Sequence, residues 1–189
     1  MMQHIALEEL AVCWGVWLLS IVWPRRRSLR EQRVEVWASR WGIFLNIVGF
    51  ASILVVARPL DFNFNIDKPE PALIAGMVLA PLSVLLAWMR RYSLSKRWRD
   101  DSKYEDDFVL VQSGVFRIVR HPSYTAALGM LLATGAIWSS SAMLVSGVLF
   151  FITGLELRLF AADRSLANRF QDEFEEYQSR VRGYIPFIR

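Results

Sequence analysis

Residues 71–89 read PALIAGMVLAPLSVLLAWM and contain no charged side chain. A helix needs about 20 apolar residues to cross the hydrocarbon core of a bilayer, with about 17 as the lower limit. This stretch is therefore long enough to cross a membrane as a single helix. Hydrophobic residues make up 54% of the whole chain. A soluble fold of this size would need polar outward faces, for which the long apolar runs leave no room.

Four further apolar segments accompany this one. The five together predict transmembrane helices over residues of about 5–23, 41–57, 71–89, 124–138 and 142–157. Only Ser139, Ser140 and Ser141 separate the last two, which predicts a tight helical hairpin. We therefore expect an all-α, polytopic membrane protein with five transmembrane helices and a C-terminal amphipathic helix. Residues 1–189 would form a single integral membrane domain.

The basic residues give an independent test of this topology. With five crossings, all of the 22 Lys and Arg residues except Arg58 and Lys68 fall on one side of the membrane. The positive-inside rule then predicts an outside N-terminus and a cytosolic C-terminus. Two polar stretches would face the cytosol, the loop 90–123 and the tail 158–189. The membrane would be the cytoplasmic membrane of a bacterium or the endoplasmic reticulum of a eukaryote.

Charge and composition also limit the partners and the bound groups. The net charge is +4 and the pI is about 9.6. The basic residues flank hydrophobic segments instead of lining a polar groove, so we expect anionic membrane lipids as partners and no nucleic acid. The single cysteine, Cys13, excludes an internal disulfide. His4 and His121 are the only histidines, and we expect no metal site.

The loop that precedes the fourth segment contains Arg120-His121-Pro122 at the point where a helix begins. Proline suits the first turn of a helix, because its missing N–H has no partner there in any case. The free N–H groups of that turn, together with the helix dipole, favour an anion. Arg120 and His121 would add donors for a carboxylate or a phosphate. The alternative is that Arg120 reaches lipid phosphates and His121 only caps the helix.

The tail carries apolar residues at helical spacing from Leu159 to Val181. They predict one face of a long amphipathic helix. Glu156 and Asp163 fall on that same face, where a carboxylate is costly unless it is paired or performs a function. One reading is a salt bridge to a loop arginine. The other is that Asp163 or Glu156 faces a cofactor or a substrate at the membrane edge.

These two regions together resemble the isoprenylcysteine carboxyl methyltransferase family and its phospholipid methyltransferase relatives. The resemblance covers about the last 80 residues, with a two-helix hairpin between its halves. The matching residues are Gly114-Val115-Phe116, Arg120-His121-Pro122-Ser123-Tyr124, Arg158, Asp163, Leu166, Phe170, Glu173, Phe174, Tyr177, Arg180-Val181 and Ile185-Pro186. The chain differs from the family pattern in two places. Ala126 stands where the family usually has glycine, and Ala162-Asp163 stands where it has two glutamates.

The resemblance implies S-adenosylmethionine as the cofactor, bound on the cytosolic side, and a lipophilic or prenylated substrate that enters from the membrane. It implies catalytic roles for Arg158 and Asp163. The cofactor-binding residues that it implies are Gly114, Arg120, His121, Pro122, Tyr124, Glu173 and Tyr177. The adenine would stack on a tail aromatic such as Tyr177 or Phe174. The acceptor would most simply be a carboxylate, as in isoprenylcysteine carboxyl methylation.

Other functions stay open at this point. A phospholipid N-methyltransferase would use the same cofactor on an amine. Membrane sterol and steroid reductases share a similar tail pattern and use NADPH, whose extra phosphate would need one of the arginine-rich loops. A scaffold or a small transporter is the alternative without catalysis. No segment carries a charge at its centre or a paired proline–glycine break, which argues against transport. We expect Asn46, in the second segment, to make a helix–helix hydrogen bond.

Overall fold

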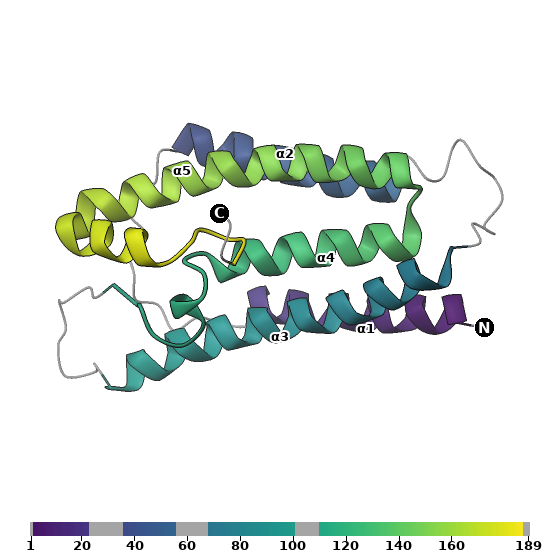
Figure 1. The fold of residues 1–189 in the computed structure, drawn as a ribbon, viewed down its shortest axis with the longest axis horizontal. Helices are drawn as coiled ribbons and strands as arrows, with labels where there is room; N and C mark the ends of the chain where they lie inside the picture. The colour runs from purple at the N-terminus through teal and green to yellow at the C-terminus, as the bar shows by residue number, and fades with distance from the viewer. Residues whose placement is uncertain (1, 23–35, 56–67, 101–109, 187–189) are drawn as a thin grey trace.

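The computed structural model describes residues 2–22, 36–55, 68–100 and 110–186. These residues form five α-helices and one short 3-10 helix, and no β-strand occurs among them. In chain order the elements are α1 (Met2–Val22), α2 (Val36–Val55), α3 (Glu70–Asp100), η1 (Gly114–Arg117), α4 (Pro122–Trp138) and α5 (Ser141–Arg180). The long helices run alternately in opposite directions along one axis (Figure 1).

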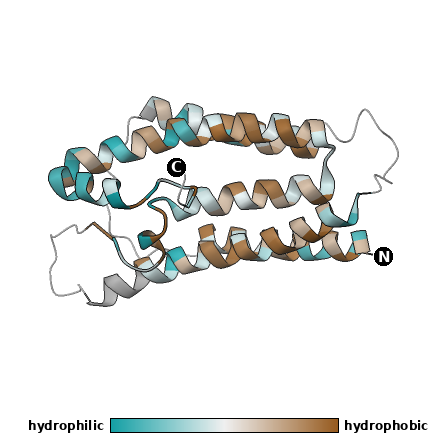
Figure 2. Ribbon diagram, in the orientation of Figure 1, coloured by the Kyte–Doolittle hydropathy of each residue, from teal (hydrophilic) through white to brown (hydrophobic). Residues whose placement is uncertain are grey.

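Four of these helices are long and apolar enough to cross a membrane. The four candidate spans are Met2–Val22, Trp37–Leu54, Glu70–Leu94 and Ser141–Arg180. Helix α4 has 17 residues and is shorter than these. The prediction of an all-helical membrane protein is therefore confirmed in its coarse form, with four candidate spans among the described residues. Apolar residues occupy the middle of the helices, and hydrophilic residues gather at the end where α5 turns (Figure 2).

The helix bounds differ from the predicted segments in two places. Helix α3 continues as a helix to Asp100, although the apolar segment ends at residue 89. The first part of the polar stretch 90–123 is thus helical, since hydrogen bonds within a helix need no apolar side chains. Residue 23 of the first predicted segment and residues 56 and 57 of the second lie outside the described residues.

The helices pack in two groups that α4 joins. Helix α1 packs on α3, and α3 packs on α4. Helix α2 lies along α5, and their backbones approach closely at two pairs of glycines (Figure 1). A Cβ atom on Gly49 would lie 2.8 Å from the carbonyl oxygen of Gly147, and one on Gly154 would lie 2.6 Å from that of Gly42. Small residues permit this approach between membrane helices. The sequence pattern therefore fixes how near α2 lies to α5.

Helix α5 is not straight, which corrects the prediction of one continuous amphipathic tail helix. Gln171 has φ 43° and ψ −119°, and the last part of α5 turns back toward the bundle there (Figure 1). The turn brings Phe174 and Tyr177 against Leu110, and all three side chains are buried. Burial of these apolar side chains offsets the cost of a positive φ at a residue other than glycine.

Candidate functional site

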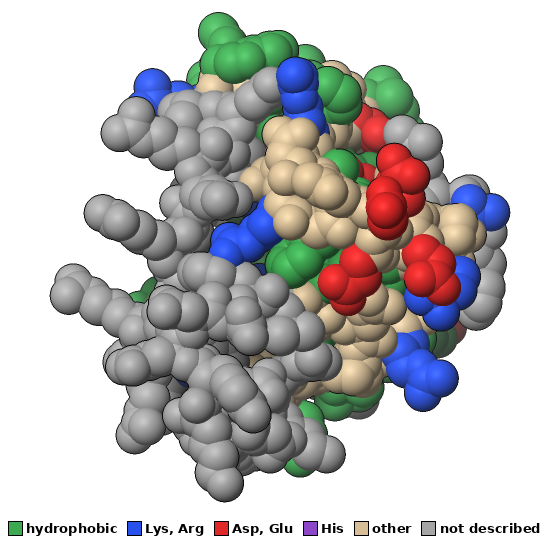
Figure 3. Space-filling view, turned by 90° about the vertical axis from the view of Figure 1, so that its left-hand side faces the viewer, with side chains coloured by type: hydrophobic (Ala, Val, Ile, Leu, Met, Phe, Trp, Pro, Cys, Tyr) green, Lys and Arg blue, Asp and Glu red, His purple; other side chains and the backbone are tan. Residues whose placement is uncertain are grey.

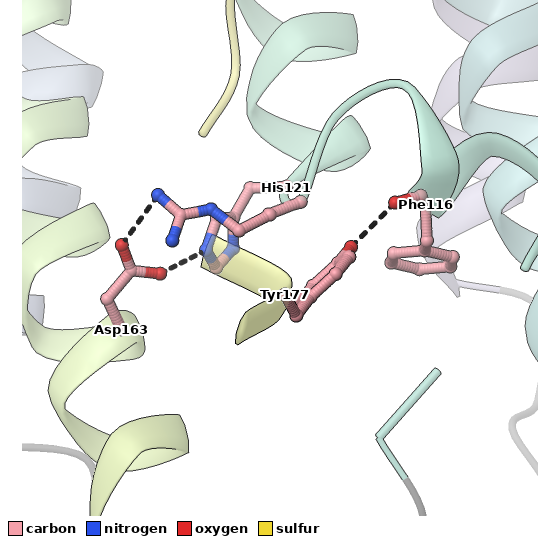
Figure 4. A network of polar contacts seen from close by, with 5 residues as sticks. Phe116, His121, Asp163 and Tyr177 are labelled. Atoms are coloured by element: carbon pink, nitrogen blue, oxygen red, sulfur yellow. Dashed lines mark hydrogen bonds and ion pairs between the residues drawn. The ribbon is translucent and has the colours of Figure 1, made fainter. Parts of the chain in front are cut away.

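The loop before α4 is held against α3 at its start. Gly114 has φ +66°, a conformation that glycine adopts at little cost, and it opens the 3-10 helix η1. A side chain at this position would collide with Ser93 of α3. The loop is also held from the other side, because the hydroxyl of Tyr177 donates to the carbonyl oxygen of Phe116 at 2.6 Å (Figure 4). Both contacts fix the path of the chain toward Arg120.

The C-terminal segment lies beside the end of this loop. The backbone N–H of Arg120 donates to the carbonyl of Arg182, and that of His121 donates to the carbonyl of Gly183, both at 2.8 Å. Four residues after His121, Thr125 Oγ1 donates to the carbonyl of Tyr184 at 2.6 Å. Anion binding by the free N–H groups in the first turn of α4 stays a prediction, but the N–H groups of Arg120 and His121 just before that turn are not free. The C-terminal segment already accepts their hydrogen bonds, because it runs parallel to the loop.

Asp163 of α5 joins the loop to the tail. Its Oδ2 lies 3.1 Å from Nη2 of Arg120, and its Oδ1 lies 2.8 Å from Nε2 of His121 (Figure 4). The side chains of Arg120, His121 and Asp163 are only 7%, 11% and 15% exposed. A charge at that depth requires a partner of opposite sign. The predicted salt bridge between the tail acid and a loop arginine is confirmed, and so is the expectation that the two regions meet.

A second series of contacts leads from His121 to α2. The ring of His121 stacks on that of Tyr124, with 5.1 Å between centroids and 10° between planes. The guanidinium of Arg158 lies over the Tyr124 ring, 4.8 Å from the ring centroid. Nη1 of Arg158 then donates to Oδ1 of Asn46 at 3.1 Å. The two residues predicted to be catalytic, Arg158 and Asp163, are thus linked through the start of α4.

A cavity of about 640 Å³ opens on the Asp163 side of α5. Ligand pockets commonly have volumes of about 300–1,000 Å³. Charged groups of both signs line this cavity together with aromatic and aliphatic side chains. The lining residues are Arg120, Glu156, Leu159, Phe160, Asp163, Arg164, Ala167, Phe174, Gln178, Val181, Arg182 and Gly183. It lies at the hydrophilic end of the bundle, where acidic and basic side chains share the described surface (Figure 3).

The comparison with known proteins finds a match over the part of the chain that contains this site. A family model described as phospholipid methyltransferase matches residues 71–173, which is more than half of the sequence and includes Arg120, His121, Arg158 and Asp163. The chain belongs to this family.

Curated proteins with similar sequences are named protein-S-isoprenylcysteine O-methyltransferases. A probable protein-S-isoprenylcysteine O-methyltransferase of Oryza sativa subsp. japonica is 31% identical over 85 residues, which are 45% of this chain and 44% of that protein. The protein-S-isoprenylcysteine O-methyltransferase of Schizosaccharomyces pombe is 34% identical over 91 residues, 46% of this chain and 37% of that protein. The one from Saccharomyces cerevisiae is 31% identical over 87 residues, 46% and 36% of the two chains. The matches cover less than half the length of these relatives, and the resemblance seen in the sequence is confirmed.

Within this family member, the predicted site residues fall into two groups. Arg120, His121, Tyr124, Arg158 and Asp163 lie together, as described above. The remaining predicted residues lie in other surroundings. Glu173 is exposed and accepts a hydrogen bond from Gln112 at 3.0 Å.

Three of the predicted cofactor ligands have a clear role in the loop's conformation. Pro122 is buried at the first position of α4, and Gly114 lies on Ser93. Tyr177 is 3% exposed and its hydroxyl binds the loop. Burial leaves little of the Tyr177 ring for an adenine to stack on. Phe174 is also buried but lines the cavity, and contact of these residues with a cofactor stays a prediction.

The sequence placed Glu156 on the same helix face as Asp163 but did not indicate its partner. Glu156 accepts a hydrogen bond from the hydroxyl of Tyr184 at 2.7 Å, and Tyr184 is 2% exposed. The C-terminal segment therefore packs on the protein between α4 and α5. Phe160 and Gln178 line the cavity without a distinguishing motif. No pattern in the sequence indicated that Tyr184 would contact Glu156.

Proposed function

We propose that this protein is a membrane methyltransferase that uses S-adenosylmethionine to methylate the carboxylate of a lipophilic acceptor. The single observation that carries the proposal is the position of Asp163. Its carboxylate joins Arg120 and His121 at the border of the 640 Å³ cavity, within the segment that matches the family model. The curated relatives are named protein-S-isoprenylcysteine O-methyltransferases, which supports O-methylation of an isoprenylcysteine carboxylate as the model reaction.

The cavity is suited to the cofactor because it offers partners for each of the cofactor's chemical groups. S-adenosylmethionine, when bound, supplies a methyl group on a cationic sulfur. Glu156 and Asp163 are the carboxylates at the cavity that would hold its ammonium or ribose hydroxyls. Arg120, Arg164 or Arg182 would bind its carboxylate. Phe160 lies 56% exposed and gives an apolar face for the adenine.

The residues around the site position the acceptor and exclude water; a general base is not required. A carboxylate is already deprotonated at neutral pH, so its oxygen can accept a methyl group without losing a proton. Arg158 would bind the second carboxylate oxygen and orient the first. The stacked rings of His121 and Tyr124 lie between Arg158 and Asp163 and keep this region dry.

The membrane topology belongs to the same proposal. We infer that α4 is a fifth span despite its 17 residues, because α3 and α5 run parallel to each other on either side of it (Figure 1). With five spans the basic loops and tail share one side, which would be the cytosol. The cavity and the Arg120–Asp163 pair would then lie at the cytosolic edge of the membrane.

Calorimetric titration of the purified protein in detergent tests the cofactor. We expect S-adenosylhomocysteine to bind with micromolar affinity and NADPH not to bind. Binding of NADPH alone would replace the proposal with a membrane reductase, and binding of neither would leave a protein without this catalysis. The acceptor is tested next with labelled S-adenosylmethionine. Label is expected in base-labile esters of S-farnesylcysteine, while label in phosphatidylethanolamine would indicate N-methylation.

A further inference from the structure

Helix α2 contributes one buried polar side chain, Asn46, to the surroundings of Arg158. Asn46 is 7% exposed, and α2 lies outside the segment 71–173 that matches the family model. Its Nδ2 donates to the carbonyl oxygen of Phe151 on α5 at 2.8 Å. Its Oδ1 accepts from Nη1 of Arg158 at 3.1 Å. Both ends of the amide therefore bind α5, one to the backbone and one to the arginine.

The close approach of the helices fixes this amide in place. A Cβ atom on Gly154 would lie 2.6 Å from Nδ2 of Asn46 and 2.6 Å from the carbonyl oxygen of Gly42. The amide thus lies directly over a glycine, where any larger residue would displace it. Because Phe151 takes the donor end, the acceptor end must face Arg158. The amide has one orientation that satisfies both partners.

Arg158 is held on its two sides by groups without a negative charge. The amide oxygen of Asn46 contacts one edge of the guanidinium, and the ring of Tyr124 lies under its face. Within the described ranges, no carboxylate forms a salt bridge with Arg158. One helical turn onward, where an acid would make an i,i+4 pair, the residue is Ala162. These two neighbours orient the guanidinium of Arg158 but do not neutralise its positive charge.

We propose that Asn46 is a positioning residue for Arg158, which it orients while leaving the guanidinium charge available to an anionic acceptor. A neutral hydrogen-bond acceptor fixes an arginine in direction, whereas an aspartate or a glutamate would also compete with a bound carboxylate for it. The inference deepens the proposed function and rests on it for the acceptor. The orientation of Arg158 by Asn46 does not depend on the acceptor and can be tested alone.

The first experiment measures the orientation without activity. Phenylglyoxal reacts with accessible arginines, and peptide mass spectrometry gives the rate at Arg158 in the purified full chain. We expect Asn46→Ala to speed this reaction severalfold, since the guanidinium loses the partner that holds it. Ser52→Ala is the matched control on the same helix, because the Ser52 hydroxyl donates within that helix, to the carbonyl of Gly49. An unchanged rate at Arg158 in Asn46→Ala would overturn the proposal whether or not the protein methylates anything.

The second experiment is a double-mutant cycle with kinetics. We expect Asn46→Ala to lower kcat/KM for S-farnesylcysteine about tenfold, as for loss of a hydrogen bond to a charged group. Its affinity for S-adenosylhomocysteine should stay within twofold, because Asn46 does not line the cavity. In an Arg158→Ala background the same change should have no further effect. Additive losses, or a parallel loss of cofactor affinity, would show that Asn46 only supports the helices.

Asn46→Asp separates orientation from charge and covers the case in which Asn46→Ala does not fold. The aspartate has the size of asparagine and keeps an oxygen toward Arg158. It should raise the KM of the carboxylate acceptor about tenfold, since it competes with that acceptor for the same charge. An unchanged KM with a stable protein would overturn the charge part of the proposal. If wild-type protein shows no methyl transfer, the proposed function fails, and the phenylglyoxal rates still decide the role of Asn46.

Discussion

The carboxylate of Asp163 on α5 lies 2.8 Å from Nε2 of His121, the residue at the N-cap position of α4. The two residues are 42 positions apart in the chain. The other oxygen of the same carboxylate meets Arg120, so one side chain fixes both residues of the loop. This pair joins α4 to α5 at the hydrophilic end of the bundle. It also forms one border of the cavity.

Neutralising Asp163 should therefore damage both stability and catalysis. We expect Asp163→Asn to lower turnover at least tenfold and to destabilise the protein by about 3–5 kcal/mol, the usual cost of removing one partner of a buried ion pair. The neighbouring change Ala162→Glu is the matched control and should have a much smaller effect. Turnover and thermal unfolding in detergent measure the two quantities. Equal and small effects of both changes would show that this face of α5 is only structural.

Arg120 and His121 should be required for cofactor binding. Arg120→Ala or His121→Ala removes a group that borders the cavity or holds Asp163 toward it, and we expect binding of S-adenosylhomocysteine to be lost. The protein should still insert into membranes, because the apolar helices are unchanged. Arg117→Ala, an exposed arginine of the same loop, should bind normally. Calorimetry on all three variants checks this, and normal binding by the first two would place the pocket elsewhere.

The sequence predicted those parts of the molecule that depend on composition and local spacing. Apolar segments gave the helices, and an acid on an apolar face indicated that Asp163 needs a partner. The turn at Gln171 could not be predicted, because glutamine is a good helix former and the apolar spacing continues past it. The contacts of residues 182–184 with the loop use backbone groups, which leave no pattern in the side chains. The Asn46–Arg158 bond depends on which helices become neighbours, and that is decided by packing across the whole bundle.

The C-terminal segment should stabilise the cavity through Tyr184. The hydroxyl of Tyr184 donates to Glu156, which lines the cavity, at 2.7 Å. We expect Tyr184→Phe to lower stability by about 1 kcal/mol, the usual contribution of one hydrogen bond, and to weaken S-adenosylhomocysteine binding severalfold. Ser179→Ala is a suitable control, because the Ser179 hydroxyl is exposed and binds its own helix at Glu176. If Tyr184→Phe melts and binds like Ser179→Ala, the segment has no part in the site.

The spacing of α2 and α5 should tolerate no side chain at the glycine contacts. A Cβ atom on Gly49 would lie 2.8 Å from the carbonyl oxygen of Gly147 and 3.1 Å from Cβ of Phe151. Gly49→Ala must therefore separate the helices, at a cost of about 1–3 kcal/mol for overpacking. Gly15→Ala in α1 is the matched control, since nothing lies within 4 Å of a Cβ atom there. That change should be neutral or stabilising, because alanine is more favourable than glycine in a helix by about 1 kcal/mol.

Thermal unfolding of the two glycine variants in the same detergent, followed by circular dichroism, compares them directly. We expect Gly49→Ala to melt several degrees below wild type and Gly15→Ala at or above it. Separating α2 from α5 should also lengthen the hydrogen bond from Arg158 to Asn46, since Asn46 lies on α2 and Arg158 lies on α5. Gly49→Ala should accordingly raise the reactivity of Arg158 as Asn46→Ala does, and Gly15→Ala should not. Equal melting temperatures for both variants would mean that α2 and α5 do not approach each other as closely as their glycines allow.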